Sequence, residues 1–177
     1  GAVAFLAFIL SYHEVGAPRW SWLWLVLVLL SLAHFYLRPR LYDGPGSPDF
    51  LLLALLIFAL RSRPGGAAVA GLVVGLVTDT LSPSTFGAGM LAHTTVAWLI
   101  AWGRAVFFAD NLVVNFGLFF AGTWLRNLLL LLAGRVGAGA LLASVATWAL
   151  LQAVTTAVAG VLVVLVIRHR VDFRIEE

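Results

Sequence analysis

Residues 71–87 read GLVVGLVTDTLSPSTFG, an apolar run with glycines four positions apart that ends in a carboxylate, Asp79. Only eight of the 177 residues are acidic. A carboxylate at the carboxyl end of an apolar helix is unfavourable, because that end carries partial negative charge and lipid does not solvate an ion. The stretch therefore predicts a helix in a membrane whose acidic residue has a specific partner.

Apolar composition extends over the whole chain. Hydrophobic residues make up 62% of the sequence and charged residues 11%, whereas soluble domains carry about a quarter charged residues. The basic balance comes from arginines that flank apolar runs, as the positive-inside rule describes, so it predicts no nucleic-acid partner. We expect an all-α integral membrane protein that folds as one compact bundle.

Arg, Pro, Gly and Asp residues divide the chain into apolar segments that predict a bundle of six transmembrane helices. At about 1.5 Å per residue, the second segment reaches only about 18 Å of a hydrocarbon core about 30 Å thick. We therefore expect it to extend into its flanks or to pack away from lipid. The predicted segments are 21–37, 49–60, 66–81, 87–103, 111–133 and 139–167.

The flanks of this domain, taken as residues 21–167, complete the predicted organisation. Residues 1–20 are expected to form a segment on the membrane surface, or the remnant of a longer start, and 168–177 a cytoplasmic tail. Six spans place both termini on one side, and that side holds seven arginines against three on the other. Because arginine marks cytoplasmic loops, both termini are predicted to be cytoplasmic. The seven are Arg19, Arg61, Arg63, Arg104, Arg168, Arg170 and Arg174.

Arg126 is the arginine inside a predicted helix, and it offers a partner for Asp79. It lies seven residues, or about 10 Å, from the outer end of the fifth segment, and Asp79 ends the third segment on the same side. The shared depth predicts an Asp79–Arg126 ion pair, with Asn127 and Thr78 as additional hydrogen-bonding groups. The alternative is that Asp79 faces outer water while Arg126 extends separately to the interface.

Small residues recur every four positions in the third segment, at Ala67, Gly71 and Gly75. This spacing places them on one face of a helix, where another backbone can approach closely. We expect this face to pack against a helix of the same chain. A partner's helix in the same place is the alternative.

The sequence offers little for catalysis or metal binding. It contains no cysteine, and His13, His34, His93 and His169 do not fall at the helical spacing of a metal site. His93 is expected to make a hydrogen bond between helices. Since no nucleophile motif, phosphate loop or pair of intramembrane carboxylates is present, we predict no catalytic residue, no cofactor, no metal and no enzyme activity.

The region from Pro48 to about Gly103 resembles the family of the rod shape-determining protein MreD. The resemblance is carried by Pro48-Asp49, the leucine-rich run 50–60, the stretch GLVVGLVTD at 71–79, and Phe86-Gly87 opening the next helix. Six spans in a chain of this length also fit the family. Leu72 departs from the pattern, since the family often has an aromatic residue there.

The resemblance implies a fold and a set of partners. It implies a fold similar to that of the ECF-transporter S-component, and a non-enzymatic part of the machinery that inserts peptidoglycan along rod-shaped bacteria. The bitopic protein MreC is the implied direct partner. RodA, a class B penicillin-binding transpeptidase and MreB are implied indirect partners in the same complex, which sits in membrane lipid.

Two function classes stay open at this point. The first is a membrane scaffold that binds MreC, with candidate contacts at Pro45, Leu81, Ser84 and Phe86 because a largely periplasmic partner must meet outward-facing groups. The second is a small-ligand-binding membrane subunit of a transporter. That function requires a polar pocket formed by Asp79, Arg126, Asn127, His93 and Gln152.

Overall fold

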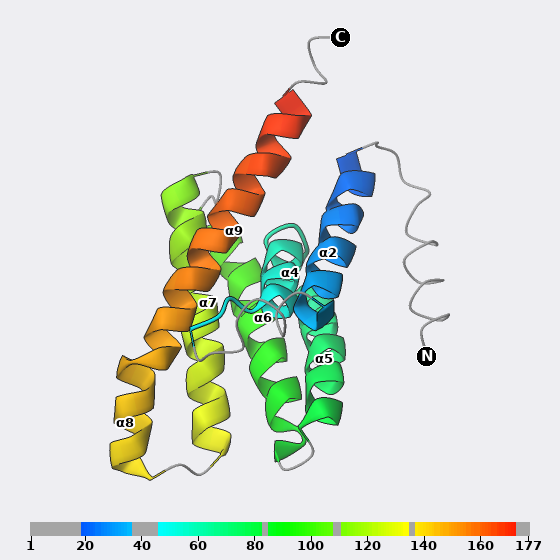
Figure 1. Ribbon diagram of the computed structural model, residues 1–177. Coiled ribbons are helices and arrows are strands. Elements are labelled where there is room, and N and C mark those ends of the chain that lie inside the picture. Colours follow the sequence, from blue (N-terminus) through cyan, green and yellow to red (C-terminus); the bar gives the residue numbers. More distant parts are fainter. Residues whose placement is uncertain (1–18, 37–45, 83–84, 108–110, 135–136, 173–177) are drawn as a thin grey trace.

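The chain folds as a bundle of helices (Figure 1). The computed structural model describes residues 19–36, 46–82, 85–107, 111–134 and 137–172. The helices alternate in direction from α2 to α7, whereas α8 and α9 run the same way; α2 begins and α9 ends at the same end of the bundle, the upper end in Figure 1. The described residues form α2 (Arg19–Tyr36), α4 (Phe50–Ala59), α5 (Pro64–Leu81), α6 (Ala88–Phe107), α7 (Leu112–Ala133), α8 (Ala138–Ala146) and α9 (Trp148–Asp172).

The predicted all-α fold and the count of six helical segments are confirmed. The last segment differs in one respect, because it is divided into α8 and α9 at Thr147. Thr147 leaves helical geometry, with a φ of −111° and a ψ of −92°, while its amide and its hydroxyl both donate to the carbonyl of Ala143. Most of the predicted surface segment 1–20, and the tail beyond Asp172, lie outside the described residues.

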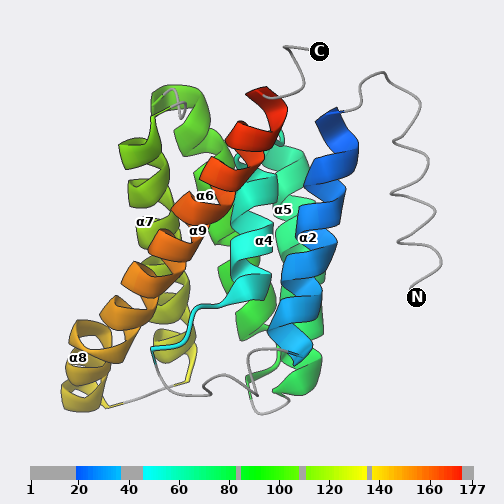
Figure 2. The ribbon, with the colours of Figure 1, turned by 45° about the horizontal axis from the view of Figure 1, so that its top comes forward.

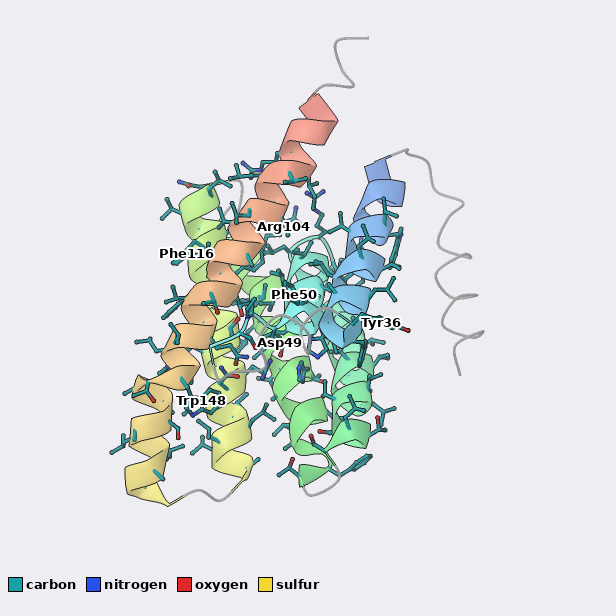
Figure 3. The ribbon with its side chains drawn as sticks, in the orientation of Figure 1. Tyr36, Asp49, Phe50, Arg104, Phe116 and Trp148 are labelled. Atoms are coloured by element: carbon teal, nitrogen blue, oxygen red, sulfur yellow. The ribbon has the colours of Figure 1, made fainter. Side chains whose placement is uncertain are left out.

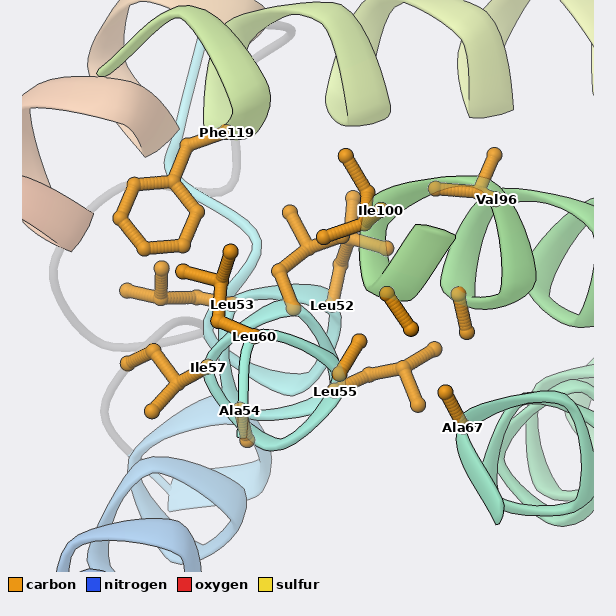
Figure 4. Close-up of a cluster of buried hydrophobic side chains, with 14 of the residues drawn as sticks. Leu52, Leu53, Ala54, Leu55, Ile57, Leu60, Ala67, Val96, Ile100 and Phe119 are labelled. Carbon is orange, nitrogen blue, oxygen red and sulfur yellow. The ribbon is translucent and has the colours of Figure 1, made fainter. Parts of the chain in front are cut away.

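Helix α4 is the centre of the bundle (Figure 2). It contacts α2, α5, α6, α7 and α9, and eight of its ten residues are buried. Leu52, Leu53 and Leu56 are completely enclosed, and Figure 4 shows Leu52 and Leu53 near Ile100 of α6 and Phe119 of α7. Of the two expectations for the short second segment, the structure shows the one in which the helix packs away from lipid.

Helix α5 has small or polar residues on its inner face and large apolar residues on its outer face. Ala67, Gly71, Gly75 and Asp79 are buried, while the leucines and most of the valines between them are exposed. A soluble helix has the opposite arrangement. Three helical stretches are long and apolar enough to cross a membrane, namely Pro64–Leu81, Leu112–Ala133 and Ala138–Arg168. The chain is a membrane protein whose outward apolar faces meet lipid.

The small-residue face of α5 packs against α6. A Cβ atom on Gly71 would overlap the backbone of His93 and Thr94, and one on Gly75 would overlap the backbone of Gly89 and Met90. The two helix backbones are therefore close enough that only glycine fits. The structure places a helix of the same chain, and not a partner, against this face.

We predict that Gly75→Ala lowers the free energy of unfolding by about 1–3 kcal/mol, because overpacking forces α5 and α6 apart. The measurement is reversible unfolding of the purified protein in mixed micelles. The matched control is Gly117→Ala, in a helix where an added Cβ meets no atom within 4 Å. Equal losses of stability in both variants would mean that the α5–α6 contact is not this close.

Candidate functional site

An extended stretch of chain, residues 46–49, lies inside the bundle. With ten residues, α4 spans about 15 Å, or roughly half of the hydrocarbon core. Figure 3 shows Asp49 and Phe50 near mid-height, below Arg104 at the upper end. Non-helical backbone at this depth needs protein partners for its amide and carbonyl groups, because lipid offers none.

Helix α9 supplies these partners. Gln152 Nε2 donates to the Ser47 carbonyl at 3.1 Å, and Thr155 Oγ1 donates to the Gly46 carbonyl at 2.9 Å. The amide of Asp49 donates to Thr156 Oγ1 at 3.3 Å. Three side chains on one helix therefore hold the extended stretch in place.

Asp49 forms a buried ion pair with Arg126 of α7. Arg126 Nη2 donates to Asp49 Oδ2, and each side chain is only 10% exposed. The other carboxylate oxygen of Asp49 accepts the amide of Leu52 at 3.0 Å, as the N-cap of α4. Because a helix N-terminus carries partial positive charge, the carboxylate is stabilised by the helix end as well as by the guanidinium.

The predicted Asp79–Arg126 pair is therefore wrong in its acidic partner. The prediction compared the depth of Arg126 with that of Asp79 alone, and took Asp49 only as the first residue of the short second segment. Because α4 is short and central, Asp49 lies within the bundle and reaches Arg126. The predicted role of Thr78 is also wrong, since its hydroxyl donates to the carbonyl of Gly75 in its own helix at 2.9 Å.

A chain of hydrogen bonds links the ion pair to α9. Arg126 Nη1 donates to Asn127 Oδ1 at 2.9 Å, as expected for Asn127 as an additional group. Asn127 Nδ2 then donates to Gln152 Oε1 at 2.8 Å, and Gln152 in turn holds Ser47. Arg126 Nε is buried and has no partner among the described residues. We call Ser47, Asp49, Arg126, Asn127, Gln152 and Thr156 the polar centre; all six are buried.

His34 joins α2 to the polar centre. Its Nδ1 lies 3.2 Å from Asp49 Oδ1 and 3.3 Å from the amide nitrogen of Leu51. These two contacts require opposite states of the nitrogen, because it must donate to a carboxylate and accept from an amide. The carboxylate is the stronger partner and favours a proton on Nδ1. Four helices, α2, α4, α7 and α9, thus meet at Asp49.

Asp79 is neutralised by backbone amides at the start of α6. Its carboxylate accepts the N–H groups of Gly87 at 2.9 Å, Gly89 at 2.9 Å and Met90 at 3.0 Å. Gly87 has a φ of 97°, which favours glycine in this turn. A Cβ on Gly89 would collide with the carboxylate. The positive end of α6 therefore compensates for the unfavourable position of Asp79 at the end of α5.

The remaining predicted positions are placed as follows. His93 is buried, but its Nδ1 lies 2.7 Å from the Gly89 carbonyl of its own helix, so the expected interhelical hydrogen bond is replaced by a local one. Leu81 and Phe86 flank the turn between α5 and α6 and are 64% and 60% exposed. Pro45 and Ser84 lie outside the described residues.

Sequence reasoning missed Asp49 and His34 as members of the site. For Asp49, the available signal was the length of the second segment. A helix that is too short to cross the membrane has one end within it, and Asp49, the N-cap of this helix, therefore lies at the depth of Arg126. For His34, three residues before the predicted end of its helix at residue 37, the sequence held no comparable signal.

We predict that Asp49→Asn and Arg126→Met each lower the free energy of unfolding by about 3–5 kcal/mol, because each leaves a buried group without its charged partner. Asparagine still caps α4, so the change isolates the charge. The double variant is expected to lose much less than the sum of the two.

The matched control cycle pairs Asp79→Asn with Arg126→Met. Its effects are expected to add within about 0.5 kcal/mol, because the two residues share no contact. Strong coupling of Arg126 to Asp79, with none to Asp49, would contradict the observed pairing.

We also predict that Asp79→Ala lowers stability by about 1–3 kcal/mol, because three amides lose their acceptor. Amide hydrogen exchange should become faster at Gly87, Gly89 and Met90 in particular. The control is Thr80→Ala, since this exposed hydroxyl bonds only within its own helix. Unchanged exchange at the three amides of Asp79→Ala would show that the carboxylate does not cap α6.

A family model described as rod shape-determining protein MreD matches residues 19–170. A search of curated proteins and a search of solved structures gave no match, so the implied similarity to the ECF-transporter S-component fold stays a prediction. The family match begins with α2 and runs through the polar centre into the end of α9. The chain therefore belongs to the MreD family of rod shape-determining membrane proteins.

Proposed function

We propose that this protein is a non-enzymatic scaffold of the cell-wall elongation machinery, which binds MreC directly and helps to maintain rod cell shape. Through MreC it would join RodA, a class B penicillin-binding transpeptidase and MreB. Membership of a family of rod shape-determining proteins supports the cellular role. The partners come from the resemblance to that family, and they are part of the proposal.

The scaffold role is supported by one observation: the buried polar side chains form hydrogen bonds within the chain itself. Asp49 and Gln152 hold other parts of the same chain, and the carboxylate of Asp79 is enclosed by the start of α6. A catalytic or ligand-binding group must instead be free to meet its substrate. The buried polar groups therefore support a rigid platform better than a reaction centre.

We further propose that the upper end of the bundle faces the cytoplasm, in the bacterial cytoplasmic membrane, with both termini on that side. Five arginines lie at or beside helix ends on that side. They are Arg19, the first residue of α2; Arg61 and Arg63, between α4 and α5; Arg104, near the end of α6; and Arg168, near the end of α9. Arginine near helix ends marks the cytoplasmic side. The lower end, with the α5–α6 turn, then faces the periplasm.

The proposed MreC contact lies at this lower end, around Leu81 and Phe86 and the sequence positions Pro45 and Ser84. Both described side chains are large, apolar and exposed next to a turn that leaves the membrane. Apolar groups of this kind act as anchors in protein interfaces. A mostly periplasmic partner can reach them without entering the bundle.

We predict that Leu81→Ser with Phe86→Ser weakens retention of MreC by about fivefold or more during purification in detergent, as expected when interface anchors are lost. The matched control is Leu142→Ser on α8, which lies at the same end and is 71% exposed. The assay is quantitative co-purification at equal protein levels. Unchanged retention in the double variant, or an equal loss in the control, would contradict the proposed contact.

The second candidate function is a small-ligand-binding subunit of a transporter, similar to the ECF-transporter S-component. One observation favours it, namely the buried Arg126 Nε that has no partner among the described residues. A bound metabolite or ATPase module in the purified protein, without MreC, would select this function over the scaffold. The pocket of this second function needs five polar residues, but most of them already have partners within the chain. Arg126 donates to Asn127, Asn127 donates to Gln152, and Asp79 accepts backbone amides of α6.

A further inference from the structure

A groove runs between α2 and α9 on the lipid-facing side of the bundle. It has a volume of about 350 Å³. Its walls are apolar and stretch over about 10 Å along α2. Several of its side chains are largely exposed, among them Leu29, Leu162 and Val166. The lining includes Val26, Leu29 and Ala33 on α2 and Leu162, Val166 and Ile167 on α9.

Three arginines gather at the upper end of this groove. Since α9 runs upward, Ile167 is the last lining residue on that helix and Arg168 follows it directly. Arg61 follows the end of α4, the helix that packs against both α2 and α9. Arg104 lies in the last turn of α6, at the same end of the bundle (Figure 3).

Arg104 and Arg168 both act electrostatically on Arg61. Desolvation by the packed helix ends lowers its pKa, and repulsion by Arg104 and Arg168 lowers it further. Arg63, only two residues away, is not among the groups that shift it. A cluster of like charges at a membrane surface is stabilised by an anion, and basic pockets between helices on the cytoplasmic side bind anionic headgroups.

We propose that the groove and the three arginines together form a binding site for an anionic phospholipid. One acyl chain lies in the groove between α2 and α9, and the phosphate meets Arg61, Arg104 and Arg168. Charge complementarity selects an anionic lipid over a zwitterionic one, and the apolar groove selects a lipid over a free phosphate. This inference rests on embedding in lipid and is independent of MreC binding.

The test uses the full-length chain, reconstituted in nanodiscs with equal phosphatidylglycerol and phosphatidylcholine, and native mass spectrometry of the lipids that it retains. Arg61→Gln with Arg168→Gln is expected to weaken phosphatidylglycerol retention by about fivefold for each arginine, as for basic side chains at an anionic surface. The matched control for each single change is Arg63→Gln, which removes one positive charge at the same end and should retain the lipid. Thermal stability of each variant verifies that it is folded.

A second variant, Ala33→Trp, fills the groove and leaves every arginine in place. It is expected to abolish the preference for phosphatidylglycerol, and soluble glycerol phosphate is not expected to displace the lipid from the unaltered protein. Equal effects of Arg63→Gln and of the double variant would overturn the proposal, because charge alone would then explain retention. Normal lipid retention by Ala33→Trp, or displacement by glycerol phosphate, would overturn it as well.

Discussion

The need to satisfy extended backbone inside a membrane is the constraint on which the rest of this structure depends. Helix α4 is too short to cross the hydrocarbon core, so residues 46–49 must run through the bundle without helical hydrogen bonds. Gln152, Thr155 and Thr156 supply partners for that stretch, and Asp49 ends it as the cap of α4. Arg126 neutralises Asp49, which makes the ion pair the point where α4, α7 and α9 are joined.

The two buried carboxylates show two solutions to the same problem of charge in lipid. Asp49 uses a guanidinium and a helix N-terminus together, whereas Asp79 uses three backbone amides of α6 and needs glycine nearby to make room. Both arrangements fix the relative position of helices. The large apolar side chains are left to face outward, and the interior is built from small residues, the α4 leucines and a few satisfied polar groups. Such an interior fits a platform that holds its shape while partners bind at its ends and faces.

Much of the fold could be predicted from the sequence, because apolar runs and their arginine boundaries report directly on membrane helices. The spacing of Gly71 and Gly75 likewise predicts close packing of α5 against another helix of the chain, although it does not identify that helix as α6. The acidic partner of Arg126 could not be obtained by matching depths along ideal helices, since the depth of Asp49 depends on where the short α4 sits within the bundle. The role of Asp79 depends on a turn at Gly87 whose geometry has no periodic signal. The break at Thr147 is a change of backbone angles at one residue, which a hydropathy pattern does not register.

The most direct test of the central claim is an experimental density map of the protein in a lipid nanodisc, at a resolution that shows side chains. This account predicts density joining the Arg126 guanidinium to the Asp49 carboxylate at mid-depth of the bundle, with Asp79 on the amides of Gly87, Gly89 and Met90. Arg126 joined to Asp79, or a solute between Arg126 and Asp49, would contradict it.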